Sequence, residues 1–162
     1  MLSGYDAHPV GAPDAMQWSA RVRLVPDGRA LAYARDHTLT LANPLSFKPS
    51  GDSAPSALDT LLCALGGELV TGLARCAVRR GLLLDACEVV VSGSLENPLV
   101  AAGVIGEEGS PALARLAVTL FVATPDPEAA IRRALDDTLS VAPVYATLAR
   151  ACPITLTLKV TL

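Results

Sequence analysis

Hydrophobic and polar residues alternate along three short stretches near the start of the chain, at residues 18–25, 29–34 and 38–42. A period of two is typical of a β-strand that buries one face. The stretches are separated by the sequences PDG and RDH, which contain residues that favour turns. The pattern therefore predicts an antiparallel meander of three strands.

The most apolar part of the chain begins with ALDTLLCALGGE at residues 57–68. Ser56 is a suitable N-cap and Gly81 a suitable stop, so we expect one helix from Ala57 to about Arg80. Small or apolar residues occupy both of its sides at 100° per residue: Leu61, Leu65, Gly72 and Cys76 on one, and Cys63, Gly67, Val70 and Ala74 on the other. A helix that is apolar all round is buried all round. We expect one side to face the chain's own sheet and the other a second copy of the chain.

The rest of the sequence predicts strands at 86–96, 113–123 and 153–162, with a loop over residues 97–112. A helix is expected over 124–139, with Asp126 as its N-cap, and a second, shorter one from Pro143. The order βββ-α-ββ-αα-β predicts an α+β domain of antiparallel strands around a long buried central helix. We expect one domain over residues 17–162 and a flexible arm over the Pro- and Gly-punctuated residues 1–16.

The composition and charge of the chain exclude several classes of function. Of the 162 residues 51% are hydrophobic and 18% charged, and the net charge of -3 has no basic runs, so nucleic acid is not an expected partner. The central helix carries Asp59, Glu68 and Arg75, too many charges for a membrane span. The four cysteines show neither zinc-site nor disulfide spacing, and no signal peptide pattern is seen, so we expect no metal, no cofactor and a cytoplasmic protein.

The run ALDTLLCALGGELVTGLARCAVRRGLLL, the following EVVVSG strand and the later ALDDTLSVAPVYATL resemble the osmotically inducible protein C and organic hydroperoxide resistance (OsmC/Ohr) family. The resemblance extends from the first hairpin to the C-terminus. It implies an intertwined α+β homodimer. It also implies thiol-dependent reduction of organic hydroperoxides by two cysteines, the first in the central helix and the second at the start of a later short helix.

Matched to that pattern, Glu68 falls on the position of the reactive cysteine and Ala142 on that of the second cysteine. Asp59 takes the place of a family acid near the helix start, and Arg29 is the nearest candidate for an arginine near the first hairpin turn. Tyr145 could border the same pocket. Both redox thiols are therefore substituted, and we expect no thiol peroxidase turnover.

Two roles are open for Glu68. It is either the acid–base or ligand-binding group of a pocket, or a structural glutamate paired with an arginine or with backbone donors at a dimer interface. The preferred function is a divergent family member that binds a small, partly apolar molecule at the dimer interface. The alternatives are an enzyme of another type that uses Glu68 as acid or base, and a structural or protein-binding dimer.

Overall fold

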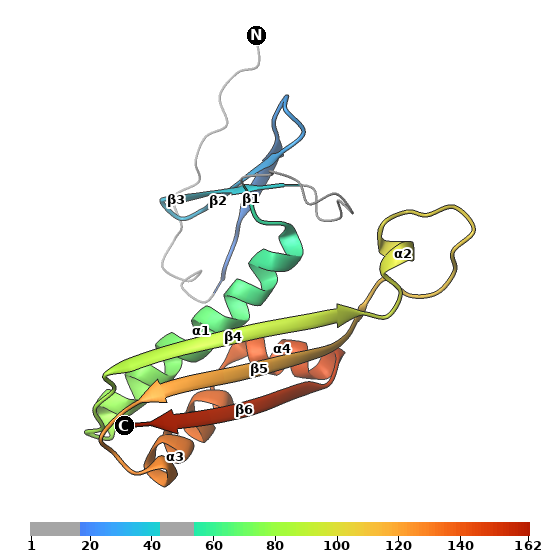
Figure 1. Cartoon of the computed structure of the whole chain (residues 1–162). Helices are drawn as coiled ribbons and strands as arrows, with labels where there is room; N and C mark the ends of the chain where they lie inside the picture. The colour runs from blue at the N-terminus through green and yellow to red at the C-terminus, as the bar shows by residue number, and fades with distance from the viewer. Residues whose placement is uncertain (1–16, 43–53) are drawn as a thin grey trace.

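The computed structural model of the chain describes residues 17–42 and 54–162. The predicted arm at residues 1–16 lies outside the described residues. In the described part, the order of the predicted strands and helices is observed, with one additional short helix (Figure 1).

The N-terminal meander forms a small antiparallel sheet of β1 (Arg21–Leu24), β2 (Ala30–Ala34) and β3 (His37–Leu41), in that order. Gly28 adopts a φ of 83° in the first turn, a conformation that suits glycine. β1 is shorter than its alternating pattern predicts, since residues 18–20 lie outside the strand.

The central helix α1 (Ala57–Arg79) starts and stops where local signals place it. The Ser56 hydroxyl accepts the backbone N–H of Asp59 at 3.0 Å, and Oδ2 of Asp59 accepts the backbone N–H of Ser56 at 2.9 Å. This capping box satisfies N–H groups that the first turn leaves free. The hydrogen bonds from Ser56 also hold the pKa of the Asp59 carboxyl below its usual value.

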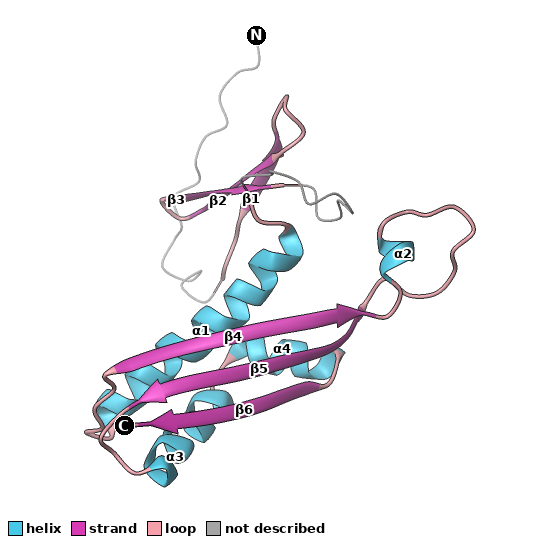
Figure 2. Ribbon diagram, viewed as in Figure 1, coloured by secondary structure: helices cyan, strands magenta, loops and turns pink. Residues whose placement is uncertain are grey.

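The larger sheet has the order β4 (Ala86–Leu95), β5 (Leu113–Ala123) and β6 (Ile154–Thr161). β4 and β5 are antiparallel, whereas β5 and β6 are parallel, an exception to the antiparallel arrangement expected from the sequence. The parallel pair arises because α3 (Glu128–Ser140) and α4 (Pro143–Ala151) carry the chain back before β6 begins. Figure 2 shows α1, α3 and α4 together on one face of this sheet.

Two local predictions need correction. The stretch between β4 and β5, expected to be a loop, contains the short helix α2 (Pro98–Ala101), whose start is capped by the Asn97 side chain. Asp126 is not the N-cap of α3, because that position belongs to Pro127. The Asp126 carboxylate instead accepts the backbone N–H of Leu83 at 2.7 Å, a contact made only once the chain has folded back.

The core lies between α1, the sheet and α3. Its fully buried large side chains include Leu65, Leu69, Leu73, Leu116, Leu120 and Ile131. Two glycines bring α1 close to its neighbours: a Cβ at Gly66 would lie 3.0 Å from Val89, and one at Gly72 would lie 2.5 Å from Cγ2 of Thr138 on α3. Close approach of α1 to its surroundings therefore depends on residues without side chains.

The opposite side of α1 is uncovered in the single chain. Cys63, Gly67 and Ala74 are exposed, and Val78 is 78% exposed. The expectation that a second copy covers this side remains a prediction.

By length and composition alone, α1 would also be long and apolar enough to cross a membrane, but the core helix of a soluble protein meets the same criterion. Its other side packs against β4 and α3, as in a core helix.

Candidate functional site

The Glu68 side chain joins the middle of α1 to the start of α4. Its Oε1 accepts the backbone N–H of Val144 at 2.9 Å, and its Oε2 accepts that of Tyr145 at 2.8 Å. Of the partners considered from the sequence, an arginine or backbone donors, the observed contacts are with backbone donors. Glu68 is half-buried, and none of the ion pairs formed by the described residues involves it.

The sequence of α4 explains why this contact is needed. The helix begins at Pro143, and its N-cap is Ala142, whose side chain cannot accept a hydrogen bond. The first backbone N–H groups of a helix have no partner within the helix and carry partial positive charge. Glu68 therefore provides from α1 the cap that Ala142 lacks, and it adds a negative charge at the favourable end of α4.

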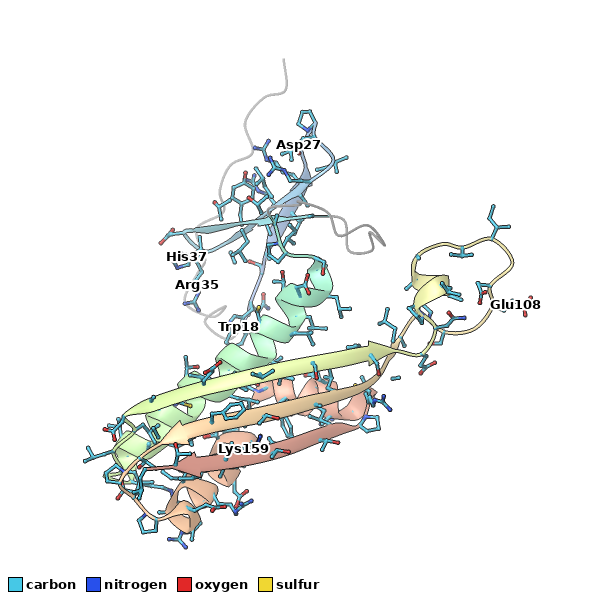
Figure 3. The ribbon with its side chains drawn as sticks, viewed as in Figure 1. Trp18, Asp27, Arg35, His37, Glu108 and Lys159 are labelled. Carbon is cyan, nitrogen blue, oxygen red and sulfur yellow. The ribbon has the colours of Figure 1, made fainter. Side chains whose placement is uncertain are left out.

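A groove of about 630 Å³ runs beside this contact. It is lined by Trp18, Leu61, Glu68, Pro143, Val144, Thr147 and Leu148. The Thr147 hydroxyl donates to the Pro143 carbonyl at 2.7 Å, so its hydrogen is already used. Trp18, labelled beside α1 in Figure 3, is 78% exposed. Among the described residues, the lining of the groove is therefore mostly apolar and contains a single carboxylate, that of Glu68.

The site residues expected from the sequence do not all lie together in the structure. Ala142 is buried and directly precedes α4, whose first N–H groups bind the Glu68 carboxylate, so both positions belong to the region around the start of that helix. Tyr145 binds Glu68 through its backbone N–H, while its side chain packs against the core. Asp59 belongs to the capping box of α1, and Arg29 pairs with Asp27 at the β1–β2 turn. Neither of these two lines the groove.

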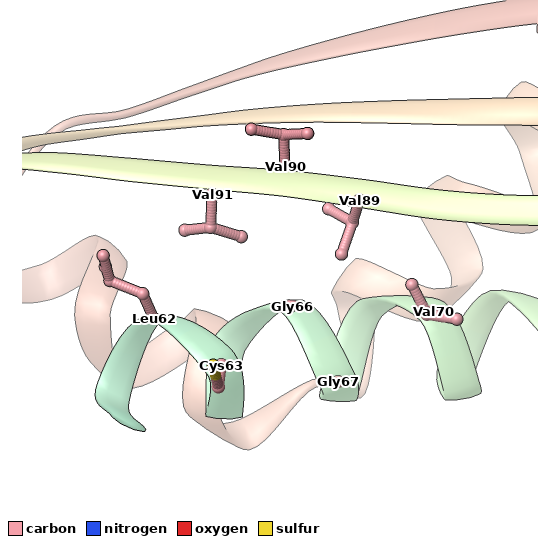
Figure 4. A pocket seen from close by; sticks show the side chains of 8 residues that line it. All are labelled: Leu62, Cys63, Gly66, Gly67, Val70, Val89, Val90 and Val91. Atoms are coloured by element: carbon pink, nitrogen blue, oxygen red, sulfur yellow. The ribbon is translucent and has the colours of Figure 1, made fainter. Parts of the chain in front are cut away.

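None of the four cysteines lines the groove beside Glu68, and all are free thiols. Cys63 is exposed and lines a second groove of about 550 Å³ between α1 and β4, shown in Figure 4. Burial raises the pKa of the Cys87 thiol. Among the described residues, no group of three or more histidines, cysteines or acidic residues could hold a metal ion.

Cys76 has an environment that the sequence reasoning missed. Hydrogen bonding by the Thr138 side chain, and then by Arg79, holds the pKa of its thiol below the usual value. Nη2 of Arg79 lies 2.9 Å from its Sγ. The Cys-x-x-Arg spacing on one helix face could have indicated this pair. With 1% exposure, however, the Cys76 sulfur is not accessible to a substrate in this conformation.

The fold is that of a known class of proteins. An OsmC like protein from Mycoplasma pneumoniae superposes with a TM-score of 0.73 at 17% identity, over 90% of this chain and 98% of that one. The organic hydroperoxide resistance protein OsmC from Legionella pneumophila gives 0.64 at 12%, over 88% and 96%. The organic hydroperoxide resistance protein OhrB of Bacillus subtilis gives 0.58 at 14%, over 88% and 98%.

The profile of the OsmC-like protein family matches residues 50–157. The chain therefore belongs to the OsmC-like family, related to the organic hydroperoxide resistance proteins, and the resemblance seen in the sequence is confirmed. No curated protein matches the sequence.

Proposed function

We propose that this OsmC-like protein does not turn over hydroperoxides and instead binds a small, partly apolar molecule in the groove beside Glu68. The observation that carries the proposal is the pair of hydrogen bonds that the Glu68 carboxylate accepts from the backbone N–H groups of Val144 and Tyr145. Through these hydrogen bonds Glu68, which by the family pattern replaces the reactive thiol, has a structural role. The adjoining groove has the mostly apolar lining and single polar group common in small-molecule sites.

A thiol peroxidase cycle needs a thiolate to attack the O–O bond and a second thiol to form a disulfide. None of the described residues that line the groove contains sulfur, and the four cysteines lie elsewhere. An enzyme that used Glu68 as acid or base would need a further polar or charged group beside it. Glu68 is the only ionisable side chain among the described residues of the groove lining, which favours binding over catalysis.

A homodimer is part of the proposal. The exposed side of α1 presents small and apolar residues, and the second groove continues this surface onto β4. Figure 4 shows Val89 and Val91 pointing from β4 toward α1 across that groove. Covering such a surface with a second copy would remove apolar area from water.

A cytoplasmic location is also proposed, supported by four cysteines that all remain free thiols.

Ligand binding can be measured with N-phenyl-1-naphthylamine, an uncharged probe that fluoresces in apolar sites. We expect saturable binding to the wild-type protein. In Thr147→Trp an indole ring would fill the groove from an exposed position of α4, and we expect affinity for the probe to fall at least about tenfold. The matched control is Ala149→Trp, which places the same ring on the same helix outside the groove lining. Equal probe affinity in the two variants would contradict the proposed site.

The dimer is tested by sedimentation at micromolar concentration, where we expect twice the chain mass of 16.7 kDa. Gly67→Arg should shift the protein to monomer, because a Cβ at Gly67 meets nothing within 4 Å in the single chain but a charged side chain there would block a second copy. Ala129→Arg, at an exposed site on α3, should remain dimeric. A folded wild-type monomer, or a dimeric Gly67→Arg variant, would refute this interface.

A further inference from the structure

The groove beside Glu68 has an unbalanced charge. Within residues 17–42 and 54–162, the lining residues other than Glu68 are uncharged, and none of the ion pairs formed there involves Glu68. The carboxylate is stabilised by two backbone N–H groups, which are dipoles and leave its formal charge in place. A molecule in the groove would therefore meet one negative charge in an otherwise apolar wall.

The carboxylate also keeps hydrogen-bonding capacity. Each of its oxygens has two acceptor sites, and the bonds from Val144 and Tyr145 use one on each. Glu68 is half-buried and forms part of the groove lining, so we expect the unused sites to be within reach of a ligand. A donor group on a ligand would find an acceptor that protein atoms have not consumed.

The N-terminus of a helix such as α4 would ordinarily favour an anionic ligand. An uncapped helix N-terminus attracts anions, since its free N–H groups carry partial positive charge. In α4 that position is already taken by Glu68, an anion supplied by the protein itself. A carboxylate or phosphate entering the groove would face a like charge and would lack the free N–H donors that bind anions at other helix ends.

We propose that the groove selects apolar molecules with a protonated amine head group over those with a neutral or anionic head. The alkyl part would lie along Leu61, Val144 and Leu148, and the ammonium group would donate to the unused acceptor sites of Glu68. Charge complementarity between this carboxylate and the head group determines the preference. The inference rests on the proposed binding function of the same groove and adds the chemical class of the ligand.

The test compares three eight-carbon compounds that differ in their head group: octylamine, octan-1-ol and octanoate. Each displaces the uncharged probe N-phenyl-1-naphthylamine at pH 7, where an alkylamine is protonated and a carboxylate ionised. We expect octylamine to bind about tenfold more tightly than octanol. Octanoate should bind at least about tenfold more weakly than octanol. The preference for octylamine should decrease at high salt, because screening weakens a partly exposed charge pair.

In Glu68→Gln the advantage of octylamine over octanol should shrink to within about threefold, since the charge is gone. The control is Glu128→Gln, which removes an exposed carboxylate outside the groove and should keep the tenfold preference. An equal or reversed ranking of the three compounds in the wild-type protein, with the probe still binding, would overturn the selectivity and leave the binding function standing. If the probe itself does not bind, the binding function fails and the selectivity fails with it.

Discussion

Replacing Glu68 by alanine is expected to lower the free energy of unfolding by about 2 to 3 kcal/mol. The change removes two hydrogen bonds with a charged acceptor, which are worth roughly 1.5 to 3 kcal/mol each when protected from water. These same two bonds cap the start of α4, and losing a helix cap costs about 1 kcal/mol on average. The estimate lies below the sum because Glu68 is half-buried and water can replace part of the bonding.

Glu68→Gln should have a smaller effect, about 1 to 2 kcal/mol. The amide oxygen can still accept one backbone N–H, whereas the amide nitrogen would face the other as a second donor. Urea denaturation at one protein concentration measures both changes, since the stability of a dimer depends on concentration. The control is Glu128→Ala, which breaks an exposed ion pair with Arg132 and should cost less than about 0.5 kcal/mol. A loss below about 0.5 kcal/mol for Glu68→Ala would show that the contact with α4 does not stabilise the fold.

The second large effect is a gain of activity. The wild-type protein should reduce tert-butyl or cumene hydroperoxide with a dithiol no faster than a control protein, whereas the double variant Glu68→Cys with Ala142→Cys should do so measurably. In the variant, a thiolate at position 68 would face the N-terminal N–H groups of α4 that now bind the carboxylate, although its side chain is two bonds shorter than that of glutamate. Such a position lowers the pKa of a thiol. The expected result is catalysis where the wild-type protein has none.

The chemistry of the double variant balances with the reagents supplied. The thiolate attacks the O–O bond and becomes a sulfenic acid while the alcohol leaves, and the second thiol then displaces water to form a disulfide that the dithiol reduces. Closure needs Cα atoms about 4.4 to 6.8 Å apart, and disulfide formation in the double variant therefore tests whether positions 68 and 142 lie within that range. Glu68→Cys alone is the control and should form a sulfenic acid without the intramolecular disulfide.

Two results would contradict this reading of the site. Failure of the double variant to form a disulfide under mild oxidation would show that the two positions do not correspond to the family's cysteine pair. Turnover by the wild-type protein that disappears in Cys63→Ser would show that a cysteine outside the groove supports the reaction, since Cys63 is the exposed thiol.

Where local signals act alone, the sequence predicts this structure well. The capping box at Ser56 and Asp59 and the glycine after Arg80 set the ends of α1, and strict alternation sets β6. One error occurs where a distant partner competes for a local group. Asp126 has the residue type of an N-cap, but its carboxylate binds Leu83, 43 residues away. The parallel pairing of β5 and β6 likewise depends on how α3 and α4 return the chain, which no strand pattern records.

The sequence by itself determined the family and the order of the strands and helices. These follow from residue types and from periodicities that act over a few neighbours. Only the tertiary structure decided what Glu68 does, because its partners on α4 lie 76 and 77 residues away. A helix start whose N-cap side chain cannot accept a hydrogen bond leaves backbone N–H groups without an acceptor. The packing of α1 against α4 brings the Glu68 carboxylate to those N–H groups.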